Sequence, residues 1–140
     1  FMEKPKRALP KPTPETIHFW EGTRAGKLLL QSCSACKGIY FPPRPFCPDC
    51  GSRNVVLAEA SGKATLDSYV INHRNHPAFE GPYAIAIVKL AEGPRMMTNI
   101  VGCPQTPEAL VLDMPLVVKY EEVSEEITLP LFEPQGEKSE

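Results

Sequence analysis

The chain has 140 residues, with 15 lysine and arginine residues against 17 aspartate and glutamate residues, and a formal net charge of −2. This length suits one ordinary domain, or a small core joined to a metal-stabilised module. The balanced charge argues against a protein that binds nucleic acid through its net charge. No apolar run approaches the roughly twenty residues that a membrane-spanning helix needs.

The first segment, residues 1–12, is expected to be a flexible arm. It mixes three prolines with Lys4, Lys6, Arg7 and Lys11. Such a segment has too few apolar side chains to fold by itself, and it is equally suited to lying on a partner.

A helix is predicted over residues 13–26. Thr13 is expected to be its N-cap, with Pro14 at the first helical position, where a missing N–H costs nothing. Phe19 and Trp20 are adjacent, so on a short helix they point in different directions and need two apolar surfaces. We interpret the pair either as packing on the rest of the chain or as contacting a partner or ligand.

Four cysteines form the most specific pattern in the chain: Cys33 and Cys36, then Cys47 and Cys50. A Cys-x2-Cys turn aims both sulfurs at one point, and two such turns complete the tetrahedral site that a structural Zn²⁺ prefers. Iron is the alternative occupant, because a rubredoxin site has the same ligands. Disulfides would need an oxidising compartment, and the sequence shows no secretory signal. Four thiolates leave no open coordination position, so the metal is expected to hold structure.

Residues 27–57 are predicted to form a zinc ribbon around these cysteines. Strands are expected at 28–32, 38–41 and 55–57, and prolines interrupt the backbone after the second. Five cysteines without an export signal indicate a cytoplasmic protein. The fifth, Cys103, is interpreted as a small buried apolar side chain.

Residues 58–133 are predicted to form a five-stranded barrel. The fourth and fifth strands are separated from the third by a short helical stretch at 107–110, which is the order of an OB-fold. The run Tyr83–Leu90 is almost continuously apolar, which is typical of a strand buried on both sides. Residues 134–140 are expected to be a frayed tail. The predicted strands cover 64–71, 83–90, 95–101, 114–122 and 127–132.

Residues 13–133 resemble a known family of acyl-CoA-associated proteins, in which a rubredoxin-like zinc ribbon is joined to an OB-fold. The family was first defined as a domain of unknown function. The resemblance rests on the cysteine spacing, on the order of the parts, and on the stretches Phe19–Gly22, His76–Phe79, Pro82–Ala86, Glu92–Gly102 and Met114–Pro115. It implies a mainly β fold with an N-terminal helix, a rubredoxin-like zinc ribbon and a five-stranded OB-fold barrel.

The resemblance also implies a function. Members are companion subunits of thiolase-fold enzymes, lipid-transfer-protein-like aldolases or acyl-CoA hydratases, and the active residues generally belong to the partner. This chain is therefore expected to be a noncatalytic member of a hetero-oligomer, with its helix and ribbon docking the enzyme and its barrel loops near CoA.

Several residues could serve an acyl-CoA or interface role. OB barrels commonly bind ligands around the loop between their first two strands, and a histidine there could donate a hydrogen bond to a phosphate or a thioester oxygen. The opposing interpretation is an ordinary polar loop. The candidates in and beside this loop are His73, Arg74, His76, Phe79 and Tyr83, and Phe19 and Trp20 of the helix join them.

Two alternatives come from other classes of protein. A single-stranded nucleic-acid binder would need a basic groove with stacking aromatics, whereas basic residues are dispersed and glutamates crowd positions 121–126. A stand-alone enzyme on acyl thioesters would need a nucleophile beside a base. His73 and Cys103 are the imaginable pair, and nothing in the sequence places them together, so no catalytic residue is predicted.

Overall fold

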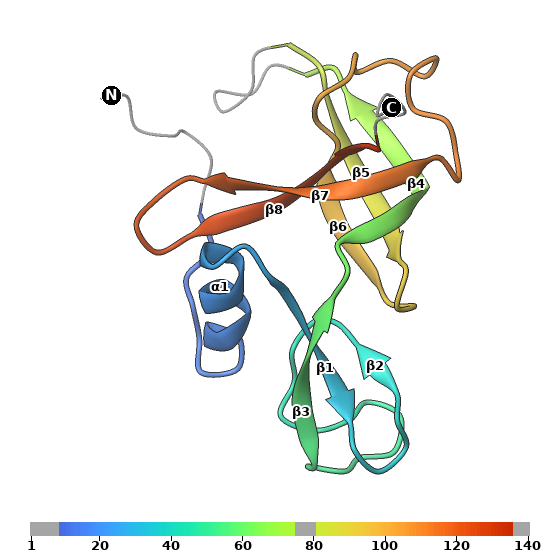
Figure 1. The fold of residues 1–140 in the computed structure, drawn as a ribbon. Helices are drawn as coiled ribbons and strands as arrows, with labels where there is room; N and C mark the ends of the chain where they lie inside the picture. The colour runs from blue at the N-terminus through green and yellow to red at the C-terminus, as the bar shows by residue number, and fades with distance from the viewer. Residues whose placement is uncertain (1–8, 75–80, 136–140) are drawn as a thin grey trace.

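The computed structural model describes residues 9–74 and 81–135. Within these ranges the chain forms one helix and two β-sheets, and the smaller sheet lies below the larger one in Figure 1. The predicted mainly β fold class is confirmed. Most of the predicted arm and tail lies outside the described residues, as do His76 and Phe79. The helix in the described part of the chain is neither long nor apolar enough to cross a membrane.

Helix α1 (Ile17–Arg24) begins one turn later than the sequence predicted. The backbone N–H and the hydroxyl of Thr13 lie 2.9 and 3.0 Å from the Thr16 hydroxyl oxygen. Thr16 is the N-cap residue, and its side chain caps no backbone N–H of the helix. The prediction that Thr13 caps the helix is therefore wrong, because the Thr16 and Ile17 N–H groups donate to the Thr13 carbonyl and close a turn ahead of the helix.

The smaller sheet is antiparallel, in the order β2-β1-β3. Strand β1 (Leu28–Cys33) pairs along its whole length with β3 (Val55–Ala60), and β2 (Ile39–Tyr40) adds a short edge. Strand β3 is longer than predicted, since it continues to Ala60. Only two residues then separate it from the first strand of the larger sheet.

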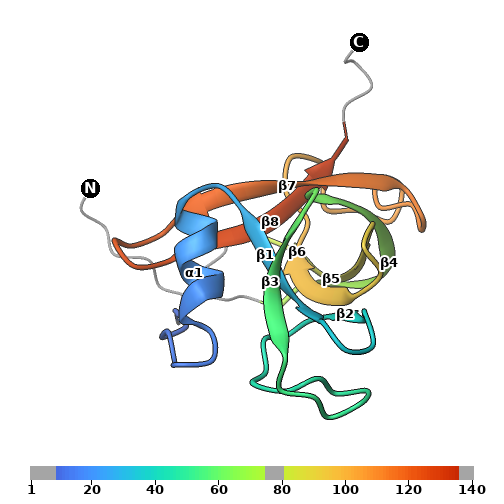
Figure 2. The ribbon, with the colours of Figure 1, turned by 60° about the horizontal axis from the view of Figure 1, so that its bottom comes forward.

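The larger sheet is a nearly closed antiparallel barrel in the order β6-β5-β4-β7-β8 (Figure 2). Its two edge strands meet at a bridge between Ile100 and Phe132, where the Val101 N–H also donates to the Phe132 carbonyl at 2.8 Å. The five strands are β4 (Lys63–Asn72), β5 (Tyr83–Leu90), β6 (Arg95–Asn99), β7 (Pro115–Glu122) and β8 (Thr128–Pro134).

One hydrophobic core runs through both sheets. Leu28 and Leu30 of β1 belong to the same buried cluster as Leu66 of β4 and Phe132 of β8, and Phe19 of α1 joins it. Because apolar side chains from the ribbon are buried against the barrel, neither sheet has an independent interior.

Two sequence-based expectations for the barrel need correction. Strand β5 buries one face through Ala84, Ala86 and Val88, whereas Tyr83, Ile85 and Ile87 on the other face are half-buried. It is therefore not buried on both sides, since its outer face is only partly covered. Residues 107–109 form a turn and not a helix, held by the Ala109 and Leu110 N–H groups donating to the Thr106 carbonyl.

Gly62, between β3 and β4, occupies a position that excludes side chains. Its φ is +85°, and a Cβ there would lie 2.7 Å from Cγ1 of Val118. Its carbonyl also accepts a hydrogen bond from the Val118 N–H at 2.8 Å, so the connection between β3 and β4 cannot move away from Val118 without losing this bond. We expect Gly62→Ala to lower the free energy of unfolding by more than about 2 kcal/mol, from backbone strain and steric overlap together.

Gly26 is the matched control in a urea titration of both variants. Its φ is +78°, and a Cβ there would meet nothing within 4 Å. Gly26→Ala should therefore cost only the backbone strain, about 1–2 kcal/mol. Equal losses for the two variants would show that the contact with Val118 is unimportant.

Candidate metal centre and neighbouring cavity

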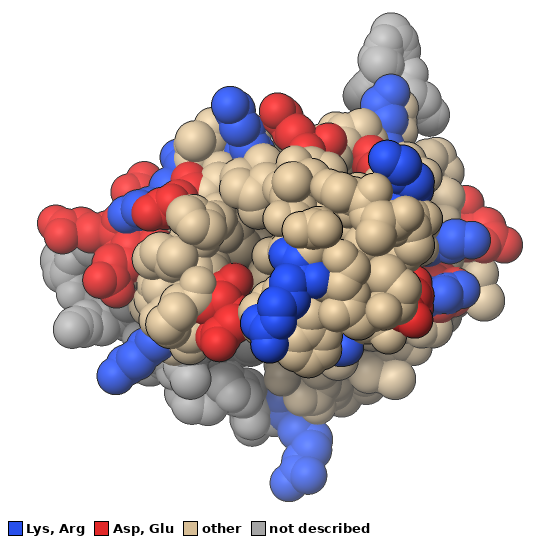
Figure 3. Space-filling model, turned by 90° about the horizontal axis from the view of Figure 1, so that it is seen from below, with Lys and Arg blue, Asp and Glu red and all other residues tan. Residues whose placement is uncertain are grey.

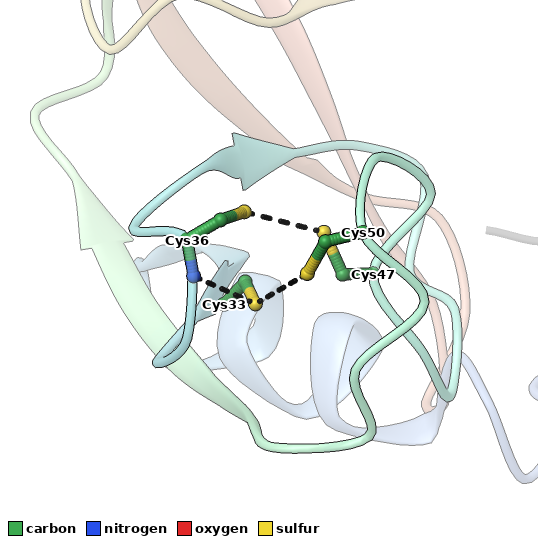
Figure 4. Close-up of side chains that lie close together, drawn as sticks. All are labelled: Cys33, Cys36, Cys47 and Cys50. Carbon is green, nitrogen blue, oxygen red and sulfur yellow. Dashed lines mark hydrogen bonds between the residues drawn. The ribbon is translucent and has the colours of Figure 1, made fainter.

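The four paired cysteines meet at one end of the smaller sheet (Figure 4). Cys33 ends β1, Cys36 follows in the turn before β2, and Cys47 and Cys50 lie in the loop between β2 and β3. All four sulfur atoms lie within 4.8 Å of one another. Local turns thus place the pairs, and the pairing of β1 with β3 brings the two turns together.

The sulfur separations fit a four-coordinate metal. The Sγ atoms of Cys33 and Cys50 lie 3.6 Å apart, and those of Cys36 and Cys47 lie 3.7 Å apart. Metal–sulfur bonds of about 2.3 Å in a tetrahedron place the sulfurs about 3.8 Å from one another. The four cysteines are therefore placed to hold a four-coordinate metal ion.

Backbone amides and neighbouring sulfurs act on these thiols in opposite directions. The Cys36 N–H lies 3.4 Å from the Cys33 sulfur and lowers the pKa of that thiol to about 6. Although the Gly38 N–H acts to lower the pKa of Cys36, the neighbouring sulfurs, that of Cys47 first, raise it to about 12. Four thiolates this close repel one another, so a cation among them is what lets all four ionise together.

An apolar cavity of about 410 Å³ lies between α1 and the barrel. Phe19, Trp20 and Phe41 line it. The ring centroids of Phe19 and Trp20 lie 4.9 Å apart, with the rings nearly perpendicular, and those of Phe19 and Phe41 lie 5.3 Å apart. The barrel supplies the remaining wall from β5, β6 and β8. The barrel residues are Tyr83, Ile85, Met96, Met97, Thr98, Asn99, Leu129, Pro130 and Leu131.

The structure brings together only some of the residues proposed for an acyl-CoA or interface role. Phe19, Trp20 and Tyr83 line this one cavity, so the two helix aromatics do not face separate surfaces. His73 and Arg74 are exposed beyond the end of β4 and do not line it. The role assigned to these five residues stays a prediction.

Sequence reasoning missed the rest of the cavity wall. Phe41, Met97 and Leu129 come from three distant segments, and only the barrel topology makes them neighbours. Their one common signal in the sequence is an apolar side chain, which is far too frequent to identify a site.

The imagined cysteine–histidine pair gains no support in the described residues. Cys103 is half-buried, and burial raises the pKa of its thiol, which leaves it poorly ionised near neutral pH. His73 is exposed, and no contact between the two side chains is found.

Charged side chains do not gather at the ribbon end of the molecule. Figure 3, seen from that end, shows a mostly uncharged surface, in which a basic side chain near the centre lies beside an acidic one and other charges of both signs lie around the rim. This face therefore lacks the continuous basic groove that single-stranded nucleic acid requires.

Comparison with known proteins agrees with this architecture. Two family descriptions match the chain: "ChsH2, rubredoxin-like zinc ribbon domain" over residues 20–56 and "ChsH2, C-terminal OB-fold domain" over residues 58–121. A "DUF35 domain-containing scaffold protein" of Methanothermobacter thermautotrophicus is 32% identical over 80% of this chain and 86% of the relative. The chain belongs to the DUF35 family.

Two further similarities are to proteins whose descriptions name an enzyme or a subunit of one. A solved structure described as "Ltp2-ChsH2(DUF35) aldolase" matches with a TM-score of 0.81 and 39% identity, covering 90% of this chain and 98% of that one. A "Probable enoyl-CoA hydratase alpha subunit" of Thermomonospora curvata is 42% identical over 94% of this chain. The DUF35 chain spans 42% of that relative's length. The family resemblance seen in the sequence is thus confirmed.

Proposed function

We propose that this chain is a noncatalytic, zinc-stabilised companion subunit of an enzyme that acts on acyl-CoA thioesters. One observation carries the proposal: the chain covers 98% of a solved chain, at 39% identity, whose description names an Ltp2-ChsH2(DUF35) aldolase. The hydratase-subunit description of the Thermomonospora relative supports the same chemical class. The partner is accordingly a thiolase-fold aldolase or an acyl-CoA hydratase.

Zinc is the proposed occupant of the four-cysteine site. Four sulfur ligands at tetrahedral spacing suit zinc and iron equally, and the family description names a zinc ribbon. The ion would stabilise the turns of the ribbon and take no part in the chemistry, since four protein ligands leave no position for a substrate.

The reacting groups are proposed to lie in the partner. In the described ranges, the group of cysteine, histidine and acidic side chains close enough to hold a metal is the ribbon site itself. The thiol of Cys103 is not activated. This chain therefore offers surfaces and stability in place of a nucleophile or a general base.

The ribbon is the proposed docking surface for that partner. Four of the eight exposed large hydrophobic side chains in the described residues are on it: Ile39, Phe46, Val56 and Leu57. Ile39 and Val56 both pair with Ser32 of β1, from opposite sides, so they share one face of the sheet. An exposed apolar face beside an uncharged surface is typical of a protein interface.

The decisive experiment is affinity capture of the tagged full chain from its native cells, followed by native mass spectrometry. Recovery of a thiolase-fold enzyme or an acyl-CoA hydratase, with the metal retained, is the expected result. Recovery of nucleic acid, or of no acyl-CoA enzyme, would contradict the proposed function.

Replacing Val56 with glutamate should weaken capture of the partner by at least about tenfold, because a carboxylate would be desolvated in an apolar interface. Val111→Glu is the matched control. The two valines are 53% and 57% exposed, and Val111 lies away from the ribbon, in the segment before β7. Equal capture by both variants, measured by co-purification with the recovered enzyme, would exclude the ribbon face as the docking surface.

A further inference from the structure

We propose that the cavity between α1 and the barrel is a binding site for the hydrocarbon part of an acyl thioester. The inference rests on the proposed function for the choice of thioester. The site itself is argued from the cavity's position, size and chemistry.

The cavity exists because the barrel is incompletely closed. Edge strands β6 and β8 meet at Ile100 and Phe132, and Val101 continues this contact. The cavity lies beside this contact and is lined by Met96–Asn99 on one strand and Leu129–Leu131 on the other. Helix α1 covers this space with Phe19 and Trp20, which makes a pocket out of a gap in the sheet.

The size of the cavity suits a small-molecule group. The cavity measures about 410 Å³ and is open to solvent at Met97, which is 67% exposed. Ligand pockets begin at about 300 Å³. The cavity is thus large enough for an acyl group and small for a complete CoA thioester, and one side chain inserted by a partner would leave much of it empty.

The chemistry of the wall selects an uncharged, apolar ligand. None of its twelve residues carries a charge, so the wall offers no partner for the phosphates of CoA. Its polar side chains already bond within the protein. The Thr98 hydroxyl donates to the Pro130 carbonyl at 3.0 Å, and the Asn99 amide donates to the Ala84 carbonyl at 2.7 Å.

Tyr83 is engaged in the same way, since its hydroxyl oxygen accepts a hydrogen bond from the Asn72 amide at 2.8 Å. The aromatic rings and the methionines therefore supply most of the contact surface, and both groups bind hydrocarbon well. The CoA portion of a bound thioester would extend out of the cavity.

Trp20 is a built-in reporter for the test, because it is the one tryptophan in the sequence and lines the cavity. The full chain is titrated with decanoyl-CoA and, separately, with CoA while tryptophan fluorescence is recorded. We expect a saturable change with decanoyl-CoA and none with CoA. The same saturable change with CoA alone would overturn the proposal, since the signal would then not report the acyl group.

Two leucine variants localise the binding. Leu129→Gln places an amide in the cavity wall and should raise the apparent Kd for decanoyl-CoA by at least about tenfold, a loss of about 1.4 kcal/mol. Leu112→Gln makes the same change in the segment before β7, where Leu112 is 57% exposed and does not line the cavity. It should leave the Kd unchanged. Thermal unfolding of both variants shows whether each is folded, and equal Kd values in two folded variants would place the binding elsewhere.

A third titration adds the captured partner enzyme without any thioester. If the partner changes Trp20 fluorescence and decanoyl-CoA does not, a partner side chain fills the cavity and the acyl site is excluded. Co-purification is scored separately, so the two proposals fail in different ways. If the chain binds decanoyl-CoA but captures no acyl-CoA enzyme, the proposed acyl site stands and the proposed companion function fails.

Discussion

Replacing Cys50 with serine should release the metal and unfold the ribbon. Cys50 supplies one of four sulfurs that lie within 4.8 Å of one another, and a hydroxyl is a much weaker ligand for a thiophilic metal. Zinc binding in small ribbons contributes an apparent free energy of about 10–16 kcal/mol, which is coupled to folding. We therefore expect loss of the bound metal and of several kcal/mol of stability, measured by metal analysis and urea unfolding.

Cys103→Ser is the control for that experiment, because it makes the same atomic change at a cysteine outside the metal site. Cys103 packs beside the barrel core as a half-buried side chain, so its serine variant should lose about 1 kcal/mol and retain the metal. A Cys50→Ser protein with full stability and no metal would show that the ribbon folds without the ion.

Replacing Phe132 with alanine should destabilise the whole chain by about 3–5 kcal/mol. Phe132 is fully buried on β8 and forms, with Ile100, the bridge between the edge strands of the barrel. The cavity left behind cannot collapse easily, because residues from both sheets share this core. The loss should appear as a lower urea midpoint in one cooperative transition, with the m-value unchanged.

Phe46→Ala provides the comparison for this variant. Phe46 is 43% exposed on the ribbon, so its truncation should cost less than about 1 kcal/mol. Comparable losses at the two phenylalanines would contradict the burial described here. Two separate unfolding transitions for Phe132→Ala would contradict the shared core.

The metal site was accessible to sequence reasoning because its geometry is mostly local. Each Cys-x2-Cys turn fixes two sulfurs within four residues, and the flanking sequence indicated strands before and after the turns. The order of the barrel strands was also predictable from local patterns, since turn residues separate the apolar runs at 83–90 and 95–101.

The cavity was not accessible, because it depends on where strands stop pairing. Leu129 and Met97 line one cavity because β8 and β6 are the two edges of the barrel sheet, and no property of either segment alone predicts that arrangement. The start of α1 was mispredicted for a related reason. The Thr13 hydroxyl bonds the Thr16 hydroxyl, and the N-cap pattern alone does not predict that bond.

The two-residue connection between β3 and β4 determines how the molecule transmits force. Ser61 donates its N–H to a carboxylate oxygen of Glu92 at 2.8 Å, and Gly62 is bonded to Val118, so each residue of the connection is fixed to the barrel. A two-residue joint held in this way cannot act as a hinge. The metal-bearing turns and the barrel should therefore move as one rigid body. A partner that contacts both would meet them at a constant separation.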